Sequence, residues 1–419
     1  HKQLERVWGT GSGWQRLSAV NHTILGKRFM LTAFVFFAIG GILAMLIRAQ
    51  LATPNSAFVG PDIYNQLFSM HGTVMMFLFA IPMLEGLAIY MIPKMIGARD
   101  LVCPRLTSLG YWCYLFGGII LSFSLILEMA PNSGWFMYTP LSGSEYSPGL
   151  GSDFWLLGIT FVEISALSAG VELVVSILRT RTQGMALHKM PLFAWYILAM
   201  ALMIVVGFPP LILGSILLEL ERAVGMPFFE VTGGGDPILW QHLFWLFGHP
   251  EVYIIFLPAA GIVSTLIPVF AGRPIVGYGW VVFAITVTGF ISFGLWVHHM
   301  FTVGIPQLAQ AFFSAASMLV AVPTAIQVFV WLATLWLGKP KMKLPMLWIM
   351  VGGMFFPLIA GLYYWLPLFS GRMPSETLGK WGFWLTFLGF NGTFLIMHWT
   401  GLLGRSEERR VGKECRSRW

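Results

Sequence analysis

Residues 238–269 read ILWQHLFWLFGHPEVYIIFLPAAGIVSTLIPV, an apolar stretch with one acidic residue and neither lysine nor arginine. A helix rises about 1.5 Å per residue, so this stretch exceeds the roughly 20 residues that cross the hydrocarbon of a bilayer. His249, Glu251 and Tyr253 lie near its middle. Polar side chains at that depth are costly and mark functional sites. The stretch therefore predicts a membrane-spanning helix that carries part of a binding site.

Composition places the whole chain in the same class. Of its 419 residues, 57% are hydrophobic and 10% are charged, whereas about a quarter of a soluble domain is charged. We predict an all-α, polytopic transmembrane helix bundle of about ten spans. These spans are residues 29–47, 67–93, 109–127, 154–178, 192–218, 238–269, 275–301, 308–337, 345–369 and 382–403. The net charge of +7 is assigned to cytoplasmic loops and not to nucleic-acid binding, and the three cysteines form no paired motif.

The charges of the loops predict the orientation. Basic residues gather in the N-terminal segment and in every second loop, while the loops between them are neutral or acidic. By the positive-inside rule, the N-terminus is cytoplasmic and the spans alternate in direction. The alternation fails once, because the loop 370–381 should lie outside yet carries Arg372 and Lys380. Either the bias is weak there, or an odd number of spans is missing near residues 345–360.

The last fifteen residues, RSEERRVGKECRSRW at 405–419, differ in kind from the rest. They are polar and show no helical apolar stripe. A basic tail that binds anionic lipid is one interpretation. We prefer a non-native tail, because the string resembles the conceptual translation of a sequencing adapter. The membrane domain is therefore expected to be residues 1–404.

Position sorts the nine histidines. His71, His249, His298 and His299 lie within predicted spans, at depths compatible with one site in the middle-to-outer half of the bundle. His298 and His299 diverge by about 100° on a regular helix, so both reach one metal only if the helix is distorted or the rings curl inward. Three imidazoles with an open position suit copper or zinc. His71 alone is equally well explained as a core histidine satisfied by hydrogen bonds.

Glu251 and Tyr253 extend this constellation. Tyr253 is one turn from His249 on the same face, so its hydroxyl can lie beside a metal and donate a proton or a hydrogen atom. Glu251 lies on another face, where apolar surroundings favour its protonated form and suit it to carry protons. Pro250 removes a helical hydrogen bond and bends the span.

With these residues in place, the chain from about Val20 to Gly404 resembles subunit I of the haem–copper oxygen reductases, of the cytochrome c oxidase type. The stretches that carry the resemblance include MHGTVMMFLFAIP (70–82), GWFMYTPLSG (134–143), WLFGHPEVY (245–253) and WVHHMFTVG (296–304). The pairing of HPEVY with a downstream HHMFTVG is highly specific, because it combines metal ligands with the side chains around them.

The resemblance implies a role for each matching residue. His249, His298 and His299 would hold the copper of the oxygen site. Tyr253 would be covalently joined to His249 and would supply an electron and a proton, and Glu251 would carry protons. The other implied assignments are His71 as an axial ligand of the low-spin haem, Arg48 and Trp135 against the cofactor, Asp100 at the cytoplasmic mouth of the proton path to Glu251, and Ser264 and Thr324 on a second path.

Two departures from the family concern these proton paths. Gln327 stands where the second path usually has a lysine, and an amide cannot relay a charge as lysine does. Ile89 and Thr107 stand where the first path usually has asparagines. Three other acidic residues in predicted spans offer a different route or simply bond neighbouring helices, namely Glu85, Glu163 and Glu172.

The third departure is a gap between Met350 and Val351. The family has a segment there with an H-D-T-Y-like run and an H-F-H-like pair, whose histidines are the axial ligand of the high-spin haem and the second ligand of the low-spin haem. Haem iron needs such ligands. We therefore expect that a chain with this sequence cannot hold a working binuclear centre of haem iron and copper. An error in the sequence is preferred over an evolved variant.

The resemblance implies the catalytic subunit of an aerobic terminal oxidase in the bacterial cytoplasmic membrane, which passes electrons from cytochrome c to oxygen and translocates protons. The implied cofactors are low-spin and high-spin haem of type a or o and copper, with magnesium a further option. The implied partners are the lipid bilayer, cytochrome c, a subunit II that carries a copper site, and a subunit III. The alternatives are a related nitric oxide reductase, and a non-catalytic membrane scaffold or proton transporter.

Overall fold

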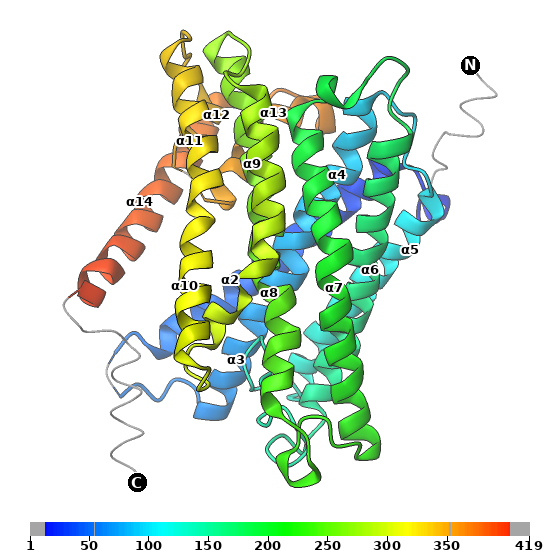
Figure 1. Cartoon of the computed structure of the whole chain (residues 1–419), viewed down its shortest axis with the longest axis vertical. Helices are drawn as coiled ribbons and strands as arrows, with labels where there is room; N and C mark the ends of the chain where they lie inside the picture. Colours follow the sequence, from blue (N-terminus) through cyan, green and yellow to red (C-terminus); the bar gives the residue numbers. More distant parts are fainter. Residues whose placement is uncertain (1–12, 54, 352, 403–419) are drawn as a thin grey trace.

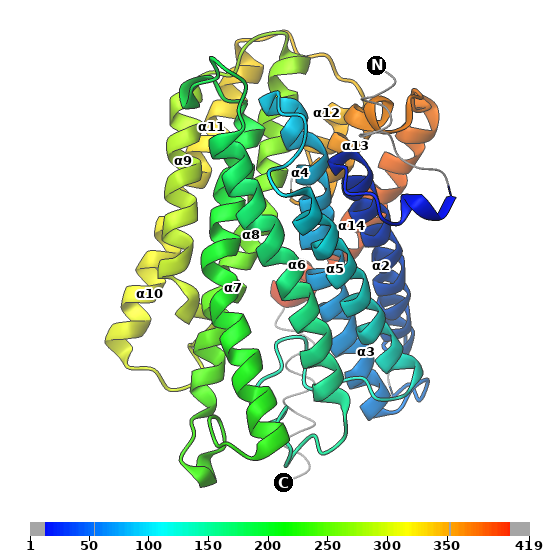
Figure 2. The ribbon, with the colours of Figure 1, turned by 90° about the vertical axis from the view of Figure 1, so that its right-hand side faces the viewer.

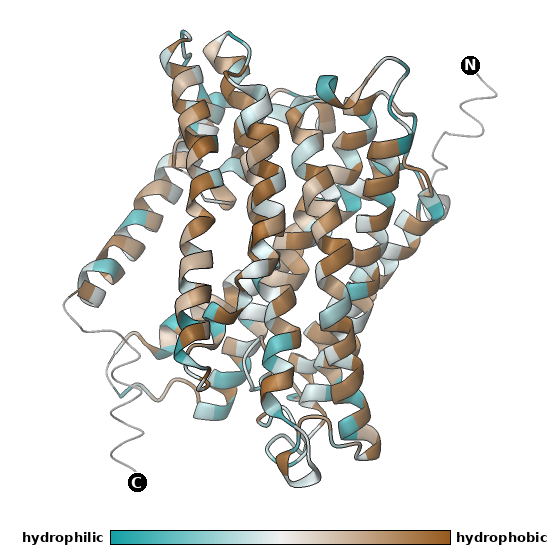
Figure 3. Cartoon of the chain, viewed as in Figure 1, coloured by the Kyte–Doolittle hydropathy of each residue, from teal (hydrophilic) through white to brown (hydrophobic). Residues whose placement is uncertain are grey.

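The structure, a computed structural model, describes residues 13–53, 55–351 and 353–402, and the regular elements of that part are all helices. Figure 1 and Figure 2 show most of them standing side by side along the long axis of a bundle. In Figure 3 apolar residues dominate the middle of these helices, and hydrophilic residues gather near the loops. The predicted all-α, polytopic bundle is thereby confirmed.

Within the described part, eight helical segments are long and apolar enough to cross a membrane. In chain order the elements are η1 (Gly13–Arg16), α2 (His22–Gln50), α3 (Pro61–Thr73), the π-helix η2 (Val74–Ala80), α4 (Ile81–Ile96), α5 (Pro104–Ile126), α6 (Gly151–Arg179), η3 (Leu187–Lys189), α7 (Leu192–Val224), η4 (Val231–Gly233), α8 (Pro237–Ala271), α9 (Tyr278–Ile291), η5 (Ser292–Gly294), η6 (Trp296–Met300), α10 (Gln307–Leu319), α11 (Ala321–Trp336), α12 (Leu344–Ile349), α13 (Phe355–Ser370) and α14 (Glu376–Leu402). The eight segments correspond one to one to the first eight predicted spans, with ends that differ by a few residues.

Local sequence sets where the helix of the metal site begins and ends. The side chain of Asp236 accepts a hydrogen bond from the amide of Ile238, and Pro237 occupies the first turn of α8, where a missing N–H costs nothing. Gly272 ends the helix in the left-handed conformation with φ of 67°. Between these ends α8 is continuous, with Pro250 inside it, and its polar residues lie inside the bundle.

Glycines let the first helices approach closely. A Cβ atom at Gly26 would lie 2.7 Å from the Cβ of Tyr90, and one at Gly86 would lie 2.6 Å from the Cβ of Phe29. α2 and α4 thus meet backbone to backbone. This is the usual way of packing where no hydrophobic effect drives helices together.

The segment 344–370 does not cross the bundle. α12 and α13 pack against each other as a hairpin, with the ring centroids of Trp348 and Tyr363 6.3 Å apart. Met350 and Val351, the residues on either side of the proposed gap, lie in its turn. α12 has six residues and α13 has sixteen, so each is too short to span hydrocarbon alone.

Both ends of the hairpin lie on one side of the molecule, which we term the basic side, where α2 begins and α4 and α8 end. Just before the hairpin, the amide of Lys339 donates to the carbonyl of Ala271 at the end of α8. At its other end, Lys27 Nζ of α2 donates to the carbonyl of Phe369 over 2.6 Å. Figure 1 shows α12 and α13 together at one end of the bundle.

The hairpin explains the failed charge alternation. Because residues 344–370 return to the side they started from, the loops 338–343 and 370–381 are both on the basic side. The predicted crossing at 345–369 is therefore wrong, since a single hydropathy window cannot distinguish a crossing from two short helices joined by a turn. The tenth predicted span, 382–403, coincides with α14 as far as Leu402. This helix is not among the eight apolar segments because polar residues and glycines dilute it. The predicted tail 405–419 lies outside the described residues.

Candidate metal centre

Two elements supply the three clustered histidines. His249 lies on α8, and His298 and His299 lie on η6. The regular part of the preceding helix ends at Ile291, and Leu295 has φ of −138° before a 3₁₀ turn takes over. This break is the distortion that the sequence required if two adjacent histidines were to reach one metal.

The ligand atoms of His249, His298 and His299 all lie within 4.8 Å of one another. His249 Nδ1 is 3.1 Å from His299 Nε2, and the His249 and His298 ring centroids are 4.4 Å apart. Among the described residues, no other group of three histidine, cysteine or acidic side chains gathers in this way. The buried Nε2 of His249 has no hydrogen-bond partner there. A buried orphan nitrogen within a set of three imidazoles fits a copper or zinc ion.

Neighbouring side chains fix the orientation of two of these rings. The indole of Trp245 stacks on His299 with a centroid distance of 4.0 Å and an interplanar angle of 5°. Trp245 Nε1 donates to the Tyr138 hydroxyl over 2.6 Å, and burial raises the pKa of that hydroxyl, so it stays protonated. His298 Nδ1 lies 2.7 Å from Ser317 Oγ. Such outer contacts set ring orientation and tautomer.

Sequence reasoning missed Trp245, Tyr138 and Ser317 as supports of the site. Trp245 precedes His249 by one turn on the same face of the helix, and this spacing could have identified Trp245 as a neighbour of the site. Tyr138 and Ser317 come from distant parts of the chain, so no local spacing identifies them.

Tyr253 and Glu251 differ in how they lie relative to the cluster. The Tyr253 ring centroid is 4.9 Å from that of His249, as their one-turn spacing predicts. Glu251 is fully buried, and neither carboxyl oxygen has a hydrogen-bond partner among the described residues. Burial of an ionised carboxyl without a hydrogen-bond partner is costly, so the surroundings of Glu251 disfavour its charged form.

His71 lies outside the cluster. Its Nδ1 is 2.9 Å from the carbonyl of Gly40, an arrangement that leaves Nε2 for another partner. Trp135 packs against the same helix at Gly72, where an added Cβ atom would lie only 2.7 Å from the Trp135 ring. Trp135 also reaches α8 through Phe244, at a centroid distance of 5.4 Å. Arg48 is exposed near the end of α2.

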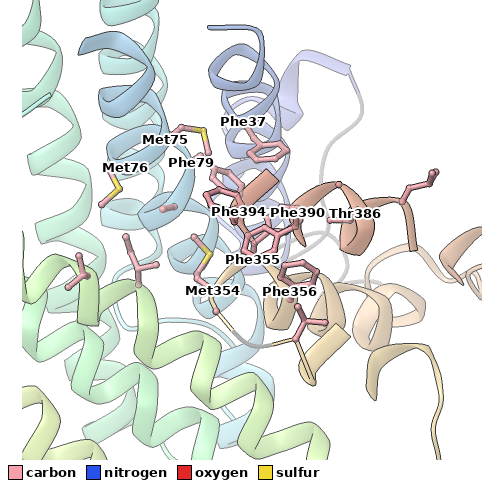
Figure 4. A pocket seen from close by; sticks show the side chains of 17 residues that line it. Phe37, Met75, Met76, Phe79, Met354, Phe355, Phe356, Thr386, Phe390 and Phe394 are labelled. Atoms are coloured by element: carbon pink, nitrogen blue, oxygen red, sulfur yellow. The ribbon is translucent and has the colours of Figure 1, made fainter. Parts of the chain in front are cut away.

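An apolar cavity of about 890 Å³ begins one turn beyond His71, at Met75 (Figure 4). The hairpin turn and α14 form its other walls through Met354, Phe355 and Phe390. Its seventeen lining residues include no histidine, no cysteine, no tyrosine and no charged side chain. Haem iron needs an axial ligand, and the anionic propionates of haem need polar partners. Among the described lining residues, the thioethers of Met75, Met76 and Met354 are the only possible iron ligands, and Thr386 is the only polar side chain. With no cation for the propionates, this lining does not fit a haem.

Asp100 lies on the basic side, as predicted. It is buried, its Oδ1 accepts from the amides of His22 and Leu101, and it is 3.2 Å from His22 Nδ1. Ser264 is buried in a polar cluster, where it bonds the Tyr196 hydroxyl at 3.0 Å. That hydroxyl donates to Gln327 Oε1 over 2.7 Å, so the unexpected glutamine is part of the same network.

The other predicted polar residues bond within their own helix or to a neighbouring helix, except for one oxygen of Glu85. The hydroxyl of Thr324 donates to the carbonyl of Val320 in its own helix. Glu172 accepts from Thr107 Oγ1 at 2.5 Å and from the amide of Cys103 at 2.9 Å, which anchors the start of α5 to α6. Ser215 donates to Glu163 at 3.2 Å. One carboxyl oxygen of Glu85 is buried with no partner among the described residues.

Comparison with known proteins identifies the family. The profile of "Cytochrome C and Quinol oxidase polypeptide I" matches residues 24–361 and 348–414. The chain is 40% identical to cytochrome c oxidase subunit 1 of Bacillus subtilis, over 93% of this chain and 69% of the relative. It is 38% identical to the proteins of the same name from Corynebacterium glutamicum, over 93% and 73%, and from Bacillus sp. (strain PS3), over 96% and 71%.

Two details of these matches bear on the predicted boundaries. The alignment with the Bacillus subtilis protein covers 430 positions, more than the 419 residues of this chain, so the relative contains positions with no counterpart here. The two profile matches overlap at residues 348–361, and the second extends to residue 414, within the predicted tail. The profile match and the histidine cluster agree, and the chain belongs to the family of cytochrome c and quinol oxidase polypeptide I.

Proposed function

We propose that this chain is the catalytic subunit of an aerobic terminal oxidase, which reduces oxygen to water with electrons from cytochrome c. The observation that carries the proposal is the cluster of the buried His249 with the half-buried His298 and His299, with Tyr253 and Glu251 beside it, in a membrane bundle of the oxidase family. The nitric oxide reductase alternative is not favoured, because the relatives described above are named cytochrome c oxidase subunit 1.

In this proposal the three imidazoles hold copper, which supplies one-electron redox chemistry when bound. Tyr253 Oη lies on the His249 face and gives a proton to the reacting oxygen. Glu251 delivers protons from the side of Asp100, the side that carries the basic loops and is therefore cytoplasmic. Ser264 and Thr324 contribute less to proton delivery, since the Ser264 hydroxyl is held by Tyr196 and Trp331. Gln327 cannot take a charge.

The same proposal includes a missing segment between Met350 and Val351. The hairpin turn at these residues, the apolar cavity beside it and the length of the alignment with the Bacillus subtilis relative all support it. The segment would supply the haem ligands that the cavity lacks. The oxidase activity proposed above therefore belongs to the chain that contains this segment; without it, we expect the chain to bind copper but no haem pair and to show no turnover of oxygen.

Electron transfer to this site requires further subunits. A subunit II with its own copper site, a subunit III and cytochrome c are the partners we propose, in a bacterial cytoplasmic membrane with the N-terminus inside. The described part of this chain has two free cysteines, the exposed Cys103 just before α5 and the buried Cys113 within it, and they form no copper-binding pair.

The test compares the purified chain as given with a variant that carries the Bacillus subtilis segment between Met350 and Val351. We expect about one copper per chain in both proteins, measured by mass spectrometry of the metal, and haem bands in the reduced-minus-oxidised spectrum only of the variant. Oxygen consumption with reduced cytochrome c should follow the haem bands. Absence of copper from both proteins would contradict the assigned function, and haem bands in the chain as given would contradict the missing segment.

A further inference from the structure

A small basic pocket lies at the start of α2, far from the metal centre. It has a volume of about 350 Å³ and is lined by Arg16, Ile24, Lys27, Arg28 and Leu31. The four residues from α2 follow the spacing i, i+3, i+4 and i+7, so they form one face of the helix. Three cations and two aliphatic side chains thus share one surface on the basic side.

Among the described residues, the ion pairs do not include Arg16, Lys27 or Arg28, although Asp100 lies nearby at the start of α2, against His22. Residues 13–53 contain no aspartate and no glutamate. Arg28 donates to the carbonyls of Arg16 and Leu17, and Lys27 donates to the carbonyl of Phe369. Carbonyl partners orient these cations but leave their charge, and a guanidinium has five N–H donors, so Arg28 retains donors for a ligand.

The aliphatic part of the pocket continues along α2. Leu31 is 69% exposed, and Val35 and Ile42, further along the helix, are 54% and 61% exposed. On the other side of the cations, Trp14 of η1 is 87% exposed, and tryptophan prefers the membrane–water boundary. A ligand of this surface therefore meets cations at the boundary and a hydrocarbon-like strip towards the membrane centre.

We propose that this surface binds an anionic membrane phospholipid. Its phosphate contacts Arg16, Lys27 and Arg28, and an acyl chain lies along Leu31 and Val35. Charge complementarity selects an anionic headgroup over a zwitterionic one, and the exposed aliphatic strip distinguishes a lipid from free phosphate. Because Lys27 also bonds Phe369, the lipid would sit where the hairpin meets α2.

The test measures lipid binding to the full chain by native mass spectrometry, with phosphatidylglycerol and phosphatidylcholine of equal chain length as probes. The double variant R16Q/K27Q removes two exposed cations. K339Q/K341Q removes two cations from another loop of the basic side and is the matched control. Each charge near a membrane surface contributes about fivefold in affinity, so we expect roughly 25-fold weaker phosphatidylglycerol binding in R16Q/K27Q and little change in the control.

Three results would overturn the proposal. They are equal binding of the two lipids by the unaltered chain, equal losses in the two double variants, and displacement of bound lipid by millimolar inorganic phosphate. If R16Q/K27Q does not fold, the single variant K27Q, whose side chain is exposed, gives the same comparison against K341Q with an expected loss of about fivefold.

Discussion

At the scale of single residues, the orientation of the clustered histidines depends on side chains that contact the imidazole rings. Ser317 of α10 is the hydrogen-bond partner of His298 Nδ1, and its own hydroxyl donates to the carbonyl of Phe313 over 2.6 Å. The hydroxyl is thereby fixed by α10 and in turn fixes the imidazole. A partner of this kind selects the ring nitrogen that faces the metal.

Replacing Ser317 with alanine should weaken copper binding by about 10-fold or more, the range found for outer-shell partners of metal-bound histidines. Competitive titration with a copper chelator measures this change. Ser314→Ala, on an exposed position of the same helix, is the control and should bind copper like the unaltered chain. Equal affinities of the two variants would show that Ser317 does not orient His298.

The Tyr196 hydroxyl joins Ser264 and Gln327 in the core between α7, α8 and α11. Tyr196→Phe leaves the Gln327 oxygen without this donor, and a buried hydrogen bond between membrane helices contributes about 0.6–1.7 kcal/mol. We expect the free energy of unfolding to fall by about 1 kcal/mol in denaturant titration. Tyr146→Phe, in an exposed loop, should leave it unchanged. A loss in both variants would point to a general effect of the lost hydroxyl.

The sequence predicted the residues of the cluster but not what surrounds them. His249, His298 and His299 were identified because histidines are rare in apolar spans, and His249 and Tyr253 because they are one turn apart. Tyr138 and Ser317 meet α8 and η6 only after folding, and nothing in their neighbourhoods distinguishes them. The sequence identified Gln327 only as a replacement of the lysine that the family usually has. In the structure, its side-chain amide accepts a hydrogen bond from the Tyr196 hydroxyl.

At the scale of elements, most helices follow from their apolar patterns, but η6 and the hairpin do not. The 3₁₀ turn at η6 has no proline or glycine pattern that demands it, and tertiary contacts hold it against α8. The hairpin was visible in the sequence only as a failure of the charge rule. Counting charges detected the anomaly, and the structure supplied its cause.

The hairpin predicts that the loops before and after it share one side of the membrane. In a background with its cysteines replaced by serine, Lys341→Cys and Ser375→Cys should both react with an impermeant maleimide from the side that labels a cysteine at Arg99. Glu145→Cys, in a loop of the opposite side, is the control. Labelling of Ser375→Cys together with Glu145→Cys would show that residues 344–370 cross the membrane.

At the scale of the whole molecule, the cluster joins α8 and η6, which are also linked by a hydrogen bond from Trp296 Nε1 to His242 Nδ1 over 3.2 Å. α8 and η6 come from different spans, so an ion bound by the three histidines would link them. An ion that binds only the folded chain stabilises it by about 2.7 kcal/mol when its free concentration is 100 times Kd.

Removing copper with a chelator should therefore lower the thermal midpoint of the bundle by several degrees. His249→Ala should lower it in the presence of copper and abolish the response to the chelator. His188→Ala, in a loop away from the cluster, should respond like the unaltered chain. The measurement is a thermal scan in detergent with and without copper. A chelator response that persists in His249→Ala would place the ion elsewhere.

The contacts of the hairpin also set an order of events during synthesis. Tyr90 donates to the carbonyl of Leu368, which is 278 residues later in the chain. Lys27 donates to the carbonyl of Phe369, which is 342 residues later. At about 5–20 residues per second, the ribosome needs roughly 15–55 seconds to supply the partner of Tyr90. During that interval the early helices hold a lysine and a tyrosine without their final acceptors, beside lipid or the insertion machinery. Residues 368 and 369 therefore complete contacts that α2 and α4 have left open since they were made, and stalling before residue 368 would leave this contact region exposed to proteases.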